Sequence, residues 1–350
     1  MSSKKEINIG IEIIRILAMF SIIVCHIFQE YNNELAYWLN VGVQIFILIS
    51  GFLYGSKNNK FDKEWMKKRF KKILIPYYIY IFVIILYYIC FKQNYLNIEN
   101  ILVTIFCLQL FLPGIPGLGH LWFIPLILIC YLATPLIQKI YGKITANTNL
   151  CGIIIKISII ILLLNLTVLF PLINMTLIMN VVCYIIGYFV ARLYRDGKIN
   201  DKIMKYGTIV VTILAIIIST IYILVHYILE INDNTIINMV LSYKNAFNGI
   251  AIFMILYLSL SKLKEIKNKI LNKILDVLNK YSFEIYITHL IYILGPSSLL
   301  TAMNNIVLEI VIISLLIAIS AYALHKATDM VTNLSIVGGK NEKGNVSFWN

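Results

Sequence analysis

Long apolar runs separated by short polar connections constrain this 350-residue chain more than any other feature. A helix needs about 20 mostly apolar residues to cross the hydrocarbon core of a bilayer. The sequence contains ten runs that meet or approach this length: residues 9–28, 40–56, 73–92, 121–141, 153–171, 176–194, 206–229, 240–261, 281–298 and 306–325. This pattern predicts an all-α, polytopic membrane helical bundle of about ten transmembrane helices.

The composition supports the same fold class and excludes others. The chain is 60% hydrophobic and 13% charged, whereas soluble domains are about 45–50% apolar and about 25% charged. So few charged side chains cannot cover a water-soluble particle of this size. We therefore exclude a soluble enzyme, a disordered protein and a nucleic-acid-binding domain, although the net charge is +13.

The basic residues indicate how the chain is oriented. If the N-terminus is cytoplasmic, residues 57–72, 192–205 and 262–280 form the inner connections, and these contain most of the lysines and arginines. The outer connections carry acidic residues and, among the bases, only Lys92. Because inner connections are enriched in Lys and Arg, both termini are predicted to be cytoplasmic. The same charges attract anionic membrane lipids.

The polar segments predict the remaining organisation. Residues 1–325 are expected to form one transmembrane domain, and residues 326–350 a flexible cytoplasmic tail. The apolar run 98–112 is too short to cross a membrane, so we expect a short interfacial or re-entrant helix there. Apolar residues spaced three and four apart in 262–280 predict an amphipathic helix on the inner surface.

Ionisable residues inside predicted spans are costly, and they mark function more often than in a soluble core. Arg15 and His26 lie eleven residues apart in the first span. At 100° per residue that spacing is three turns plus about 20°, so both side chains lie on one face, about 16 Å apart along the axis. The alternative is a structural Glu12–Arg15 pair with a capping histidine.

Further polar residues fall at similar depths in other spans. His120, at the outer end of its span, is expected at a depth similar to His26, where two imidazoles suit a general base, a metal site or an interface. No third ligand follows at a recognisable spacing, so no metal is predicted. His289 lies at mid-depth and Glu284 nearer the cytoplasm. Glu284 is either a proton-relay carboxylate or a counter-charge to the basic inner connection.

Two softer groupings remain open. Ser50 precedes Gly51 and offers a hydroxyl beside a close backbone approach, although small residues in spans usually serve helix packing. Trp122 follows an irregular segment rich in glycine and proline. It is either a cavity residue or an anchor in the aromatic belt.

Together these segments resemble the acyltransferase-3 family of bacterial membrane O-acyltransferases. The resemblance rests on Arg15 followed by His26, and on Gly42 to Phe46 leading to Ser50-Gly51-Phe52-Leu53. It continues in Arg69 to Tyr77, in His120-Leu121-Trp122-Phe123 with Tyr131 and Pro135, and in Tyr281-Ser282 through Ile285-Tyr286 to His289. Gln44 and Lys72 depart from the pattern, because many members carry Asp or another polar residue at the first position and Arg is usual at the second.

The resemblance implies a reaction and a role for each residue. Family members move an acyl group, most often acetyl, from acyl-CoA in the cytoplasm to a hydroxyl of a cell-surface or lipid-linked glycan. On this basis His26 is the general base, Arg15 lies along the acyl path, and Lys68, Arg69 and Lys72 hold the phosphates of acetyl-CoA, with no metal. The oxyanion or acceptor site is expected among His120, Trp122, Ser50 and His289.

Two other classes of function remain open from the sequence. A transporter or glycan exporter uses intramembrane charges as a substrate or proton path, and it is expected to depend on Glu284, His289 or Lys244 without needing CoA. An accessory membrane subunit without catalysis is the third option, and the presence of both Arg15 and His26 argues against it. The expected location is the plasma (inner) membrane of a bacterium, and the oligomeric state is not predicted.

Overall fold

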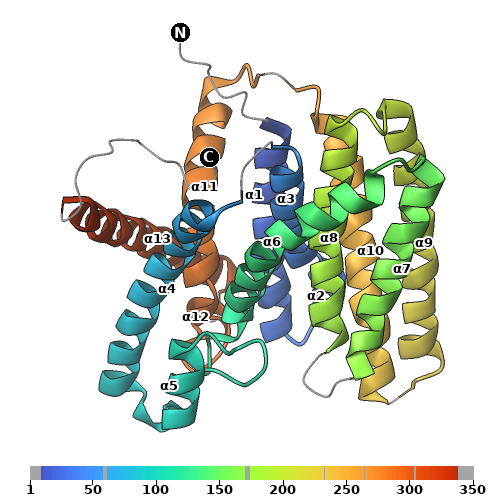
Figure 1. The fold of residues 1–350 in the computed structure, drawn as a ribbon. Helices are drawn as coiled ribbons and strands as arrows, with labels where there is room; N and C mark the ends of the chain where they lie inside the picture. Colours follow the sequence, from blue (N-terminus) through green and yellow to red (C-terminus); the bar gives the residue numbers. More distant parts are fainter. Residues whose placement is uncertain are drawn as a thin grey trace. The chain divides into compact units, whose positions relative to one another are not determined.

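The computed structural model describes residues 9–57, 61–169, 174–231, 233–263, 265–302 and 305–337, which fold into helices and their connections (Figure 1). No strand occurs in these ranges. The main helices are α1 (Ile9–Glu30), α2 (Leu35–Leu39), α3 (Gly42–Gly55), α4 (Lys63–Phe91), α5 (Ile98–Ile105), α6 (Phe123–Thr145), α7 (Leu150–Leu166), α8 (Met175–Arg195), α9 (Asp201–Ile223), α10 (Asn234–Leu260), α11 (Lys269–Thr288), α12 (Leu290–Ile293) and α13 (Ile306–Val337). The predicted all-α, polytopic bundle is confirmed.

Eight helical segments within the described ranges are long and apolar enough to cross a membrane. They match eight of the ten predicted spans. The predicted span 153–171 corresponds to α7, whose 17 residues are followed by a short 3₁₀ segment, η3 (Thr167–Leu169). The run 281–298 corresponds to the end of α11 and to α12, which are separated at His289.

Three helix boundaries differ from the sequence prediction. Helix α4 begins at Lys63, so the basic residues expected in a connection lie on its first turns. Helix α11 starts at Lys269 and continues to Thr288, so the amphipathic segment and the next apolar run share one helix instead of forming a separate surface helix. Helix α13 extends to Val337, past the expected start of the tail at residue 326, and residues 338–350 lie outside the described part.

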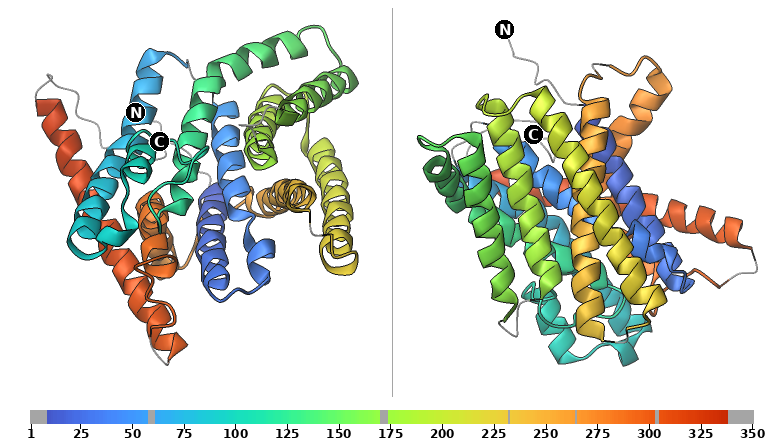
Figure 2. Two further views of the ribbon diagram at one scale, coloured as in Figure 1. Left: turned by 90° about the horizontal axis from the view of Figure 1, so that it is seen from below. Right: turned by 90° about the vertical axis from the view of Figure 1, so that its right-hand side faces the viewer.

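The chain divides into two compact units. The first unit comprises Met1–Ile22, Tyr37–Lys60 and Ala133–Leu275, and the second comprises Ile23–Ala36, Phe61–Leu132 and Asp276–Asn350. In the first unit α8, α9 and α10 run side by side, and α3 packs closely on α8 (Figure 2). A β-carbon at Gly51 or Gly187 would collide with a carbonyl oxygen of the facing helix, so glycine permits this close packing.

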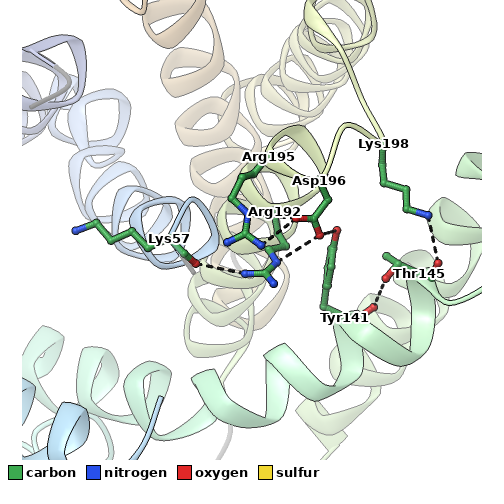
Figure 3. Close-up of polar contacts among 7 residues, drawn as sticks. All are labelled: Lys57, Tyr141, Thr145, Arg192, Arg195, Asp196 and Lys198. Atoms are coloured by element: carbon green, nitrogen blue, oxygen red, sulfur yellow. Dashed lines mark hydrogen bonds and ion pairs between the residues drawn. The ribbon is translucent and has the colours of Figure 1, made fainter. Parts of the chain in front are cut away.

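Asp196 joins α6 to the end of α8 within the first unit (Figure 3). Its carboxylate accepts a hydrogen bond of 2.9 Å from the Tyr141 hydroxyl and lies 2.9 Å from Arg195 Nη2 and 3.4 Å from Arg192 Nε. Nearby, Lys198 Nζ donates to the carbonyl oxygen of Thr145. These contacts fix the end of α8 that the basic residues assign to the cytoplasmic side.

A second polar group of the first unit lies around Lys244, which is fully buried on α10. Its Nζ donates to the carbonyl oxygen of Tyr37 at 2.6 Å and lies 4.5 Å and 4.4 Å from the ring centres of Trp38 and Tyr222. Cation–π contacts of this kind stabilise a desolvated ammonium group. The arrangement ties α2 to α9 and α10.

In the second unit, tyrosines of α4 hold the segment that precedes His120. The Tyr77 hydroxyl donates to the carbonyl oxygen of Thr104 in α5, and the Tyr88 hydroxyl donates to that of Pro116 at 2.8 Å. The run 98–112 therefore forms a short helix followed by turns, as predicted. The end of α12 packs with α13 through Ile293 and Ile317.

Candidate active site

Three histidines from distant parts of the sequence meet in the second unit. The ring centres of His26 and His289 are 5.3 Å apart, and those of His120 and His289 are 4.9 Å apart. We call His26, His120 and His289 the histidine cluster. His120 and His289 are buried, whereas His26 is partly exposed. The cluster therefore combines a polar interior with one accessible imidazole.

His26 lies near the end of α1 and is oriented by its own helix. Its Nδ1 is 2.6 Å from Oε1 of Gln29, three residues later, a spacing that places two side chains on the same face. Because this amide oxygen only accepts hydrogen bonds, Nδ1 carries the proton and Nε2 keeps its lone pair. His26 Nε2 is therefore the basic nitrogen.

His120 is held by the last turns of α11. It lies in the 3₁₀ segment η2 (Gly119–Trp122), and its Nε2 donates to the carbonyl oxygen of Ile287 at 2.8 Å. The Tyr286 hydroxyl donates to the carbonyl oxygen of His120. His120 Nδ1 is buried and has no hydrogen-bond partner among the described residues. Two contacts thus lock the ring and leave one basic nitrogen.

His289 interrupts the helix between α11 and α12. Its Nδ1 donates to the carbonyl oxygen of Tyr286 at 2.7 Å. Its Nε2 is buried without a hydrogen-bond partner within the described part of the chain. All three imidazoles therefore give one N–H to a fixed acceptor and retain one lone pair for a ligand or proton.

The loops beside His120 and His289 approach each other at two glycines. Gly117 has φ +80° and Gly295 has φ +101°, a backbone region open to glycine. A β-carbon at Gly295 would lie 2.7 Å from the α-carbon of Gly117. This contact brings the segment before His120 against the segment after His289, and it helps to assemble the histidine cluster.

Histidine is also a common metal ligand. Among the residues described, no group of three or more His, Cys, Asp or Glu side chains is arranged to hold a metal ion. The cluster instead suits proton transfer by imidazoles.

The other predicted site residues have different surroundings. Arg15 is 2% exposed and lies on α1, whose uninterrupted helix keeps it on the same face as His26. Trp122 is partly exposed in the same 3₁₀ segment as His120. Ser50 belongs to the first unit, and its hydroxyl donates to the carbonyl oxygen of Phe46 one turn earlier. That bond and the packing at Gly51 favour the packing interpretation of Ser50.

The predicted phosphate-binding residues lie at the start of α4. Lys68 is exposed, and Arg69 and Lys72 are partly exposed. The spacing of three and four places all three on neighbouring positions of one helix face. Asp62 caps this helix by accepting from the backbone N–H of Trp65 at 3.0 Å. The structure therefore presents them as a helical array of cations.

Sequence reasoning missed several contacts of the second unit. One of them joins His325 to Glu284: His325 Nδ1 donates to Oε1 of the buried Glu284 at 2.8 Å. Tyr286 and Gln29 had no role assigned, although Gln29 could have been found from its spacing to His26. Tyr286 was named only as part of a motif, and its bond to His120 could not be found because the two residues are far apart in sequence.

Comparison with known proteins adds one finding. The acyltransferase-3 family model, which describes an acyltransferase domain, matches residues 8–326, nearly the whole chain. No curated protein and no solved structure matches the chain.

Proposed function

The chain belongs to the acyltransferase-3 family and is a multipass membrane acyltransferase. From this premise we propose that it moves an acetyl group from acetyl-CoA to a hydroxyl of a cell-surface or lipid-linked glycan. The plasma membrane of a bacterium is the proposed location. The observation that carries the proposal is the partly exposed His26, whose Nδ1 proton is fixed by Gln29 and whose Nε2 is left basic. An imidazole in this state suits a general base near neutral pH.

The proposed reaction follows from this nitrogen. His26 Nε2 takes the proton of the acceptor hydroxyl while the hydroxyl oxygen attacks the thioester carbonyl carbon. The carbon–sulfur bond then breaks, CoA leaves as a thiolate, and the proton finally protonates that thiolate. The developing oxyanion needs hydrogen-bond donors. The indole N–H of Trp122 supports this role, because an indole nitrogen always donates.

The donor is proposed to bind through cations on α4. Lys68, Arg69 and Lys72 carry charges suited to the CoA phosphates, and they lie on the side predicted to be cytoplasmic. Arg15 is buried on the His26 face of α1. We propose that it lines the path of the acyl group to His26. The family match supports acyl transfer in general. The residue assignments add two proposals: that acetyl-CoA is the donor, and that the acyl group moves from the cytoplasmic side toward His26.

The experiment uses the full chain purified in nanodiscs with acetyl-CoA and candidate glycans, and follows free CoA release. We expect acceptor-dependent release in the wild type, and a loss of about 10²–10⁴-fold in His26→Ala. Gln29→Leu should lose part of the CoA release, because no acceptor then holds the proton on His26 Nδ1 and the tautomer with a basic Nε2 is no longer favoured. Release that is unchanged in His26→Ala would remove His26 as the base.

An exporter is the alternative function, and the fully buried Lys244 is the observation that favours it. Lys244→Met keeps the length and the packing of the side chain but removes its charge. The enzyme hypothesis expects transfer activity to persist in Lys244→Met, because the residue has no chemical step. If the wild type neither binds nor consumes acetyl-CoA while Lys244→Met blocks glycan export, the exporter replaces the enzyme.

A further inference from the structure

Three ionisable side chains form a connected chain in the second unit. Glu284 on α11 is 2% exposed, and its Oε1 accepts from His325 Nδ1 on α13 at 2.8 Å. His325 Nε2 lies 3.5 Å from Oδ2 of Asp329, one turn further along α13. The Asp329 side chain is 54% exposed. The chain thus runs from a buried carboxylate to an accessible one.

The buried end of this chain is incomplete. Glu284 Oε2 is buried with no hydrogen-bond partner among the described residues, and the same holds for His289 Nε2. Buried polar atoms are nearly always paired, so each of these atoms calls for a partner. The two residues are five apart, which in a helix is about 7.5 Å along the axis and about 140° around it, so they do not bond directly. The link that we propose between them is water, which pairs buried polar atoms that have no protein partner.

We propose that Glu284, His325 and Asp329 carry protons between the histidine cluster and the predicted cytoplasmic end of α13. This inference rests on the acyl transfer proposed above. When the acceptor O–H bond breaks, the proton passes from His26 through the cluster to Glu284, His325 and Asp329. It then protonates the CoA thiolate that leaves on the cytoplasmic side. The sum is alcohol plus acyl-CoA giving ester plus free CoA, with no net proton.

The arrangement of charges favours movement out of the cluster. Neighbouring imidazoles repel a second proton, so a proton taken up at His26 disfavours protonation of His120 and His289. Glu284 is a buried carboxyl group on α11, the helix that ends just before His289. The Tyr281 ring lies edge-on to His325, with 4.9 Å between the ring centres, and Lys280 and Tyr322 contact the Tyr281 ring.

The test compares two buried carboxylates of the same unit in the nanodisc assay. Glu284→Gln keeps the shape of the side chain and removes its capacity to carry a proton. Glu309→Gln is the matched control. Glu309 is 1% exposed on α13, and its carboxylate accepts from Tyr31 instead of contacting Glu284, His325 or Asp329. Acetyl-CoA affinity and thermal unfolding are measured beside the pH profile of kcat.

We expect Glu284→Gln to lower kcat about 10²-fold with unchanged acetyl-CoA affinity, and Glu309→Gln to match the wild type. Formate, a small carboxylate, should restore part of the rate in Glu284→Ala. Asp329→Asn, at an exposed position, should alter the pH profile without changing the melting temperature. A normal kcat and pH profile in Glu284→Gln would overturn the relay while acyl transfer stands. A wild type that neither binds nor uses acetyl-CoA would overturn both.

Discussion

At the scale of single residues, the tautomers of the histidine cluster restrict the roles that each ring can take. The unpaired nitrogens of His120 and His289 are acceptors while these rings are neutral. A neutral ring in this state cannot donate to an oxyanion. Either residue becomes a donor only after it gains a proton, so its charge state and its role change together. In the proposed reaction, oxyanion binding and proton transfer are therefore coupled.

The first prediction concerns the glycine contact that assembles the cluster. Gly295→Ala places a β-carbon 2.7 Å from the α-carbon of Gly117 at a φ of +101°. We expect a loss of about 1–3 kcal/mol of unfolding free energy, together with lower transfer activity. Thermal unfolding in nanodiscs measures the first effect, and CoA release measures the second.

Gly119→Ala is the matched control for this substitution. Gly119 adjoins His120, but a β-carbon there meets no atom within 4 Å. Its melting temperature should remain at the wild-type value. Equal losses in both variants would show that the Gly117–Gly295 contact is not what supports the cluster.

The residues of the cluster differ in how far they could be predicted. The pairing of His26 with Gln29 is local and follows from helical spacing. The bond from His120 to Ile287 joins positions 167 residues apart, and nothing in a single sequence specifies such a pairing. The same limit hid the bond between Glu284 and His325. Intramembrane charge marked these residues as candidates, but only tertiary packing defines their partners.

At the scale of elements, helix α4 begins with an unusual density of positive charge. Its first ten residues contain six Lys or Arg side chains. Like charges four residues apart destabilise a helix by about 0.2–0.5 kcal/mol per pair, and Lys68 and Lys72 form one such pair. A bound anion lowers the repulsion between these positive charges. The first turns of α4 are therefore less stable by themselves and attract polyanions.

The second prediction removes that pair. Lys68→Gln/Lys72→Gln should weaken acetyl-CoA binding about tenfold at low salt, which corresponds to about 1.4 kcal/mol. The difference from the wild type should shrink as the salt concentration rises, because salt screens exposed charges. Calorimetry at two ionic strengths measures both effects.

Lys202→Gln/Lys205→Gln provides the control, because it removes two exposed cations from the start of α9 instead. The affinity of this variant should equal that of the wild type. If both double variants bind equally weakly, net charge rather than α4 governs the affinity.

The third prediction concerns the Asp196 junction between α6 and α8. Burial by itself raises the pKa of this carboxyl, but the hydrogen bond from Tyr141 and the guanidinium groups of Arg195 and Arg192 lower the pKa below its usual value. The stabilisation is therefore complete above the unfolded pKa of about 3.9. It is lost as the pH falls through the folded value.

Asp196→Asn should consequently lower the stability of the protein at pH 7, by about 1 kcal/mol because the site is partly exposed. The difference between the wild type and the variant should shrink once the pH falls below the unfolded pKa of about 3.9, and it should vanish below the folded pKa. Tyr141→Phe keeps the aromatic ring and should show a smaller loss with the same pH dependence. A difference that persists at low pH would mean that the charge of the carboxylate is not its source.

The boundaries of the elements were predicted less well than their existence. Hydropathy located the apolar part of α4, but the helix starts ten residues earlier. Lys and Arg are good helix formers, and Asp62 caps the N-terminus of the helix. For the same reason α11 joins a polar segment to an apolar one. Apolar runs report where lipid contacts are expected, and helices extend beyond them.

At the scale of the whole molecule, helix length and basic charge imply different topologies. Eight segments satisfy the length criterion within the described ranges, and eight crossings would place residues 192–205 and 262–280 outside. Ten crossings, with α7 and α11–α12 included, keep both basic segments inside. Helix α7 and η3 together cover residues 150–169, about 30 Å of helix, which matches a bilayer core. We therefore expect ten crossings.

The last prediction separates the two topologies in intact cells. In a background without native cysteines, Lys198→Cys and Lys267→Cys should react with a membrane-impermeant maleimide only after permeabilisation, and Glu230→Cys should react without it. Eight crossings invert the result at all three positions, because each of them lies after α7 and before α13. The inverted pattern would place residues 192–205 and 262–280 outside and would overturn the ten-crossing topology. The start of α4 precedes α7 and lies inside in both topologies, so the proposed binding of cytoplasmic acetyl-CoA there does not depend on the result.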